Sequence, residues 1–137
     1  MATVSAIRQG LAERANTIPG LRAYPTVLDQ LNTPCLFVFG PERIRYDSTM
    51  ARGSDEFTFP LRLYVARVDE KGAQDRLDAY CSPLGDQSVK AAIEADASLG
   101  GRVDFADVRE ARNYGPYQSG QVTYLGVEFN VFVIARP

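Results

Sequence analysis

Histidine is absent from this chain of 137 residues. Its absence excludes Ser-His-Asp and Cys-His catalysis and histidine-based zinc sites, and it removes the commonest general base near neutral pH. The two cysteines, Cys35 and Cys81, belong to no C-x-x-C pair, and two isolated thiols cannot form a four-cysteine zinc site. We therefore expect both thiols to be buried structural groups in a protein kept in a reducing compartment.

Several other functional signatures are also missing. The chain has no phosphate-binding loop of the G-x-x-x-x-G-K-[ST] or G-x-G-x-x-G type, and no apolar run approaches the ~18–20 residues of a membrane span. Its first ten residues lack the basic start, apolar centre and cleavage site of a signal peptide. The net charge of -2 provides no overall field that attracts nucleic acid or an anionic membrane. We expect no metal, no cofactor and no membrane association.

Carboxylates are the remaining candidates for catalysis. Asp75 and Asp78 lie three residues apart on an expected helix, with Lys71 and Arg76 nearby, which is typical of a solvated helix face. Catalysis by such a pair would require a raised pKa in a cleft. The sequence therefore favours a protein that is not an enzyme.

The arginines occur in mixed-charge surroundings. Only Lys71 and Lys90 are lysines among the fifteen basic residues. Glu42 and Asp47 flank Arg43 and Arg45, and Asp107 and Glu110 offset Arg109 and Arg112. A nucleic-acid surface would require clustered basic residues with interleaved aromatic residues. These segments favour contact with protein partners instead.

Apolar periodicity predicts the fold. Spacings of three and four residues indicate one helix that begins after a Thr3 cap, a second that begins at an Asp69 cap with a stripe reaching Leu84, and a short third helix around Val89 to Ile93. Alternation indicates strands at residues 35–39, 43–46, 57–65, 103–114 and 125–133. We expect an α+β fold, a single domain over residues 1–137, with a largely antiparallel sheet and about three helices packed on one face.

Three details of the strands bear on the expected sheet. Pro60 cannot donate a ladder hydrogen bond, so we expect an edge or a bulge at that point of its strand. Gly115-Pro116 and Ser119-Gly120 predict a turn region. Phe132 and Ile134 make the second face of the last strand apolar near its end, which indicates either a covering helix or an interface.

A polar stretch, Tyr46 to Glu56, separates two of the expected strands. It exceeds the usual hairpin loop of about 2–5 residues and carries both charge signs. Arg52 and Asp55 bring opposite charges to either side of Gly53, which allows the backbone to bend. The stretch is either an ordinary surface loop or an arm that a neighbouring subunit or partner grips.

The whole chain resembles the tail terminator (tail completion) proteins of long-tailed bacteriophages. The resemblance rests on the order and residue pattern of several stretches, none of which is a chemically diagnostic motif. These stretches are residues 4–8, 18–21, 46–60, 73–80, 88–94, 113–117 and 124–129.

The resemblance implies a structural virion protein that forms a homohexameric ring. Such a ring caps the tail tube, stops its polymerisation and joins it to the head connector or stopper protein, while genomic DNA only passes through the lumen. It implies assembly in the bacterial host cytoplasm, a place at the head–tail junction of the virion, and no catalytic residues. The residues expected at a subunit or partner interface are Arg45, Tyr46, Asp47, Arg52, Asp55, Glu56, Tyr114, Tyr117 and Phe132.

Alternatives from other classes remain open. The chain is alternatively another head–tail joining protein, a stopper or an adaptor. A small-ligand binding module would require the second face of the sheet to enclose a pocket. An enzyme that acts through carboxylates alone is the third alternative.

Overall fold

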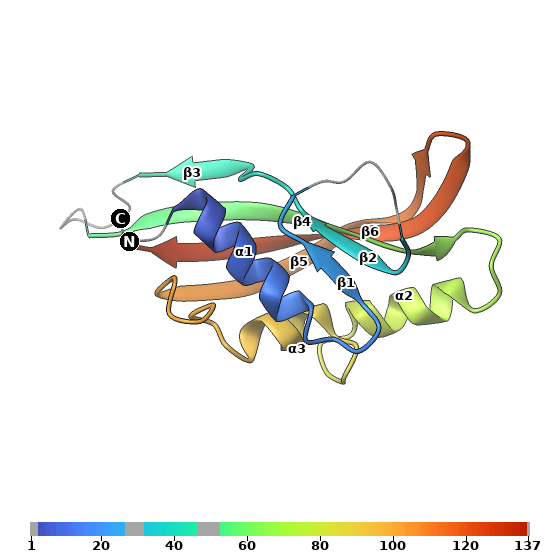
Figure 1. Ribbon diagram of the computed structural model, residues 1–137, viewed down its shortest axis with the longest axis horizontal. Coiled ribbons are helices and arrows are strands. Elements are labelled where there is room, and N and C mark those ends of the chain that lie inside the picture. The colour runs from blue at the N-terminus through green and yellow to red at the C-terminus, as the bar shows by residue number, and fades with distance from the viewer. Residues whose placement is uncertain (1–2, 27–31, 47–52, 137) are drawn as a thin grey trace.

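The computed structural model describes residues 3–26, 32–46 and 53–136 of the chain (Figure 1). In chain order the elements are α1 (Val4–Ala15), β1 (Arg22–Tyr24), β2 (Cys35–Val38), β3 (Arg43–Arg45), β4 (Asp55–Arg67), α2 (Ala73–Cys81), α3 (Val89–Glu94), β5 (Phe105–Ser119) and β6 (Val122–Ala135). The strands form one six-stranded sheet in the order β1-β2-β4-β6-β5, and β3 also pairs with β4. Only the β1–β2 pairing among these strands is parallel. The α+β prediction is confirmed.

The core lies between the three helices and one face of the sheet, which we call the covered face. Alternate residues of β4 and β6 pair across this face, including Phe59 with Val131 and Leu61 with Phe129. These side chains form one buried cluster with Ile7 and Leu11 of α1, and with residues of α2 and α3. Figure 1 shows α1 lying across the strands, with α2 and α3 along the lower side of the view.

The first helix follows its sequence signal. The Thr3 hydroxyl oxygen accepts a hydrogen bond from the Ala6 N–H at 3.0 Å, which caps α1 as expected. Ile7, Leu11 and Ala15 are fully buried at their helical spacing. At the start of α3, Ser88 provides the same kind of cap, since its hydroxyl oxygen accepts from the Ala91 N–H.

The second helix is shorter than the sequence predicts. It begins at Ala73 rather than after Asp69, because Gly72 lies in the left-handed region at a φ of 80° and turns the chain there. It ends at Cys81, and Leu84 beyond it is 78% exposed rather than part of the buried stripe. The predicted Asp69 cap and the predicted role of Leu84 are therefore wrong.

Pro60 lies in a central strand, contrary to the expectation of an edge or a bulge. Along one edge, β4 pairs with β6 without interruption at Pro60. Along the other edge the partner strand changes at this point: β3 pairs with β4 up to Thr58, and β2 pairs with it from Leu61 onward. The Pro60 carbonyl accepts from the Phe39 N–H, so the proline nitrogen also points to the side where the partner changes. A missing N–H is tolerated at that junction.

The predicted turn is confirmed at Ser119-Gly120 but is wrong at Gly115-Pro116, where β5 continues. Gly115 and Pro116 lie opposite Gly126 and Leu125, and the chain reverses only around Gly120, whose φ is 63°. The register shift between Arg112 and Gly115 lies just before the glycine and takes up Asn113, whose φ is 56°, and Tyr114 as a bulge.

Two side chains of α3 cover part of the outer edge of β5. The Val108 N–H donates to Glu94 Oε2 and the Val108 carbonyl accepts from Lys90 Nζ, each at 3.1 Å. Lys90 and Glu94 are also ion-paired, one helical turn apart. The backbone groups of Val108 that would pair with a further strand are therefore already occupied.

Candidate functional site

The second face of the sheet, which we call the open face, is lined by the alternate residues of the same strands. On β4 and β6 it includes Thr58, Arg62, Glu128, Asn130 and Phe132. The helices contribute to the core of the covered face but contribute no residue to the buried cluster on the open face. Three features lie one after another along this face: an aromatic cluster, an ion-pair network and an arginine-lined cavity.

The aromatic cluster lies where β1, β2 and β4 meet the β5–β6 hairpin. Cys35, Phe37 and Tyr64 form its buried centre, and the partly buried residues around them are Tyr24, Phe39, Tyr117 and Tyr124. The ring of Tyr117 packs beside Gly126, where an added Cβ would lie 2.3 Å from the Leu63 carbonyl oxygen and 3.1 Å from the tyrosine ring. Glycine is therefore required for the close approach of these strands.

The ion-pair network occupies the middle of the open face. Glu128 is only 8% exposed, and its two oxygens accept hydrogen bonds from Arg62 and Arg112, each at 3.1 Å. Arg112 also donates to Glu42 at 2.8 Å. The Arg62 guanidinium lies 4.9 Å from the centre of the Phe39 ring and 5.0 Å from that of Tyr117. Aromatic and carboxylate contacts together fix the position of this cation.

The surroundings of the two arginines in the network stabilise their charged forms. Hydrogen bonds to Glu128 and Glu42 raise the pKa of Arg112 above its usual value. Burial lowers the pKa of Arg62, but hydrogen bonds to Tyr64 and Glu128 outweigh it, so the net pKa is raised. Both guanidinium groups therefore remain charged and ordered at any physiological pH.

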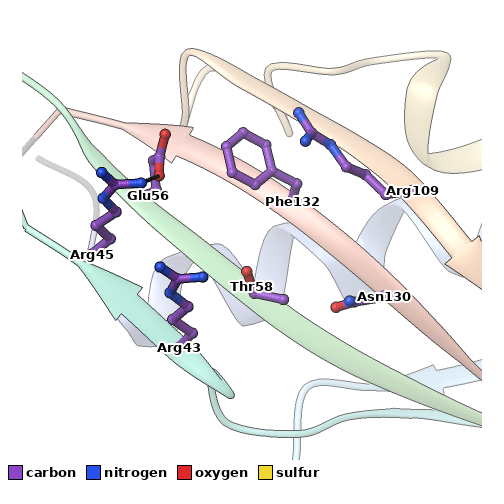
Figure 2. Close-up of a pocket in the computed structure, with 7 residues that line it drawn as sticks. All are labelled: Arg43, Arg45, Glu56, Thr58, Arg109, Asn130 and Phe132. Atoms are coloured by element: carbon purple, nitrogen blue, oxygen red, sulfur yellow. Dashed lines mark ion pairs between the residues drawn. The ribbon is translucent and has the colours of Figure 1, made fainter. Parts of the chain in front are cut away.

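The arginine-lined cavity lies beyond the network, beside β3 (Figure 2). Its volume is about 230 Å³, and it is lined by Arg43, Arg45, Glu56, Thr58, Arg109, Asn130 and Phe132. Arg45 is 3.7 Å from Glu56 in an ion pair, and the Arg109 guanidinium lies 3.9 Å from the centre of the Phe132 ring. Figure 2 shows Arg43 and Arg45 on one side of β4 and Arg109 on the far side of Phe132.

The structure brings together three of the residues expected at an interface. Arg45, Glu56 and Phe132 all line the cavity. Tyr46 directly follows β3 and is 69% exposed. Asp55 does not belong to the connecting stretch as expected, because it is the first residue of β4 and pairs with Ala135.

The remaining expected interface residues lie elsewhere or outside the described part of the chain. Asp47 and Arg52 lie outside the described residues, as does most of the polar stretch. Tyr117 belongs to the aromatic cluster of the open face, whereas the Tyr114 hydroxyl donates to Asp78 of α2 at 2.6 Å. These two tyrosines are three residues apart in β5, a spacing that points their side chains to opposite faces of the sheet, so the structure does not bring them to one surface.

Sequence reasoning missed the role of Glu128. The alternation of apolar and polar residues in β6 predicts that Glu128 lies on the face opposite the apolar side chains, but it does not predict which residues Glu128 contacts. Arg62 and Arg112 reach it from two different neighbouring strands, so only the register of the sheet reveals the contact. Asp107 and Glu110, which offset Arg109 and Arg112 in sequence, do pair with them. Glu42 pairs with Arg112 of β5 rather than with its sequence neighbour Arg43.

Chemically reactive groups are few on the described surfaces. Burial raises the pKa of both Cys35 and Cys81 to about 11, so each thiol is protonated at neutral pH. Within residues 3–26, 32–46 and 53–136 there is no cluster of three or more acidic, cysteine or histidine side chains that would hold a metal ion. No helix in the same part of the chain is both long and apolar enough to cross a membrane.

Comparison with models of known protein families finds no match for this chain, and comparison with curated protein sequences finds none either. The open face and the resemblance to tail terminators are therefore the two indications of function.

Proposed function

We propose that this protein is a structural virion component that forms a ring, caps a bacteriophage tail tube, stops its polymerisation and joins it to the head connector. The resemblance of nearly the whole chain to tail terminators supports this proposal. The single observation that supports it from the structure is the open face, a broad sheet surface with ordered charges and aromatic rings, on which no helix of the described residues packs.

The composition of the open face suits protein contact. Arginine, tyrosine and phenylalanine are the residues that dominate the energetics of protein interfaces. Here Arg62 and Arg112 are already held by Glu128, so association would not have to order these long side chains. Alternating charge signs across the face favour a specific, complementary partner.

A ring of identical subunits requires two different complementary surfaces on each subunit. We assign the open face to one of them. From the sequence, we assign the part of the polar stretch that precedes β4, residues 46–54, to the other. The number of subunits follows only from the resemblance, which implies six.

The small-ligand alternative is less well supported. The cavity of about 230 Å³ is smaller than the ~300–1,000 Å³ typical of a site for a small organic ligand, and charged side chains dominate its lining. A stopper or adaptor would use the same kind of surface, and it differs in which partner it binds.

The test combines assembly and tube capping. The full chain is mixed with tail tubes of the same virus and examined by negative-stain electron microscopy, while light scattering measures the mass of the free protein at high concentration. We expect rings on tube ends and tubes of uniform length. Protein that remains monomeric with tubes present, and leaves tube length uncontrolled, would contradict the proposal. Binding to the head connector without binding to tubes would favour the stopper alternative.

A pair of variants tests the face itself. Phe132→Asp places a charge on the open face, while Leu84→Asp places one at an exposed site between α2 and α3. We expect the first to abolish assembly and the second to leave it unchanged, with circular dichroism showing that both fold.

A further inference from the structure

We propose that the arginine-lined cavity binds a single carboxylate side chain, from an aspartate or glutamate in an acidic segment of a protein partner. The proposal concerns this cavity alone and does not depend on ring formation.

The charge inside the cavity is not balanced. Three arginines and one carboxylate line it. Arg45 has Glu56 as its partner and Arg109 has Asp107, but no carboxylate in the described part of the chain lies within ion-pairing distance of Arg43. A guanidinium binds a carboxylate through two parallel hydrogen bonds, which makes Arg43 the anchor for an incoming anion.

The cavity also offers an apolar contact. Phe132 carries the Arg109 guanidinium against its ring and forms part of the lining (Figure 2). The methylene groups of an aspartate or glutamate side chain would pack against such a ring while the carboxylate meets Arg43. Inorganic anions have no apolar part that could use this contact.

Asn130 adds an unsatisfied acceptor. Its Nδ2 donates to Glu110 Oε1 at 3.2 Å, and because a carboxylate only accepts, this contact fixes the orientation of the amide. The Oδ1 atom is then buried without a hydrogen-bond donor in the described part of the chain. A peptide N–H next to the bound carboxylate is the kind of donor that this oxygen lacks.

The surroundings favour one carboxylate over a polyphosphate strand. Asp107, Glu110 and Glu42 border the arginines on this part of the sheet. A nucleic-acid backbone carries a negative charge at every nucleotide and would pass these carboxylates, whereas a single side chain can enter without meeting them. Charge complementarity therefore points to an acidic polypeptide.

The experiment titrates the uniformly ¹⁵N-labelled full chain by NMR with a blocked tripeptide, acetyl-Ala-Glu-Ala-amide. We expect saturable shifts of the Arg43 Nε–H, the Asn130 side-chain amide and the Thr58 backbone amide, with a Kd on the order of 1–10 mM. The Gln tripeptide serves as the neutral control. Inorganic phosphate and a dT oligonucleotide at matched ionic strength represent the other anion classes.

Arg43→Gln should weaken the binding of the Glu tripeptide at least fivefold. Arg76→Gln is the matched control, because Arg76 is a similarly exposed arginine of α2 far from the cavity, and it should leave the affinity unchanged. Both side chains are exposed, so neither change is expected to disturb folding.

The proposal is overturned if the Gln tripeptide shifts the same resonances equally, or if the Glu tripeptide shifts none of them at tens of millimolar. Equal or tighter binding of phosphate would overturn the assignment to a carboxylate side chain, and tighter binding of the oligonucleotide would overturn the assignment to a protein. Because the probe is a tripeptide and the readout is local, failure here leaves the capping proposal intact.

Discussion

The two faces of the sheet are made by the same strands and differ in almost every property. On β4 and β6, Phe59 and Val131 meet on the covered face, while Arg62 and Glu128 meet a few residues away on the open face. The first pair is fully buried by helices, and the second is ordered by ion pairs and aromatic rings. The difference shows how a small sheet separates stability from recognition, since successive side chains point to opposite faces.

The largest effect should come from the covered face. Phe59→Ala removes a side chain with 0% exposure and leaves a cavity, so we expect a loss of about 3–5 kcal/mol in the free energy of unfolding. Phe132→Ala, at a half-buried site on the open face, should cost about 1 kcal/mol or less. Urea denaturation of the two variants measures the contrast. Equal losses would show that the open face is part of the core.

A smaller but still clear effect is expected from the network. Glu128→Gln leaves Arg62 and Arg112 facing a neutral amide, and we expect a loss of about 2 kcal/mol. The estimate lies below the usual cost for a fully buried pair because both arginine side chains are about one third exposed.

Glu13→Gln is the matched control for the network. Glu13 pairs with Arg102, but its side chain is 63% exposed, so the change should alter the unfolding free energy by no more than about 0.5 kcal/mol. If Glu128→Gln were as mild as this control, the network would be a surface feature rather than a structural one.

The smallest expected effect concerns the reactivity of the two thiols. Cys35 is fully buried on the open face and Cys81 is half-buried in α2, yet burial raises the pKa of each to about 11. At pH 7 we expect iodoacetamide to alkylate Cys81 about a hundredfold more slowly than a free thiol, and Cys35 only on unfolding. Rapid reaction of Cys35 in the folded protein would show that its aromatic cover opens readily.

The same thiols predict a pH dependence. A raised pKa means that the folded state holds its thiol protons more strongly, so the stabilisation is complete below pH 9 and is lost as the pH rises towards about 11. A variant with both Cys35→Ala and Cys81→Ala should lack this part of the alkaline loss. Denaturation curves between pH 8 and 11 for both proteins test it.

The sequence predicts the elements whose signals are local. The Thr3 cap, the spacing of Ile7 and Leu11, and the alternation of β4 and β6 depend only on near neighbours, and the structure agrees with them. Predictions at Asp69 and Pro60 failed because the outcome depends on partners elsewhere. At Pro60 that partner is the neighbouring strand, which changes from β3 to β2. At Asp69 the cause is nearer: Gly72, three residues on, lies in the left-handed region and sets the start of α2.

The candidate site was predictable only in part, for the same reason. Arg45 and Glu56 were suspected from the polar stretch that they border, and Phe132 from its apolar neighbours. Arg43 and Arg109 reach the same cavity through the pairing of β3, β4, β6 and β5, which no local pattern encodes.

The contacts of Lys90 and Glu94 with Val108 have a consequence for how copies of this protein can meet. An incoming strand at this point of β5 would have to displace an ion pair and both backbone contacts before it gained any ladder bond. The adjacent register shift at Arg109 further spoils the match. Growth of the sheet from one molecule into the next is thereby discouraged at the β5 edge, so copies that meet there would associate through side chains rather than through a shared ladder.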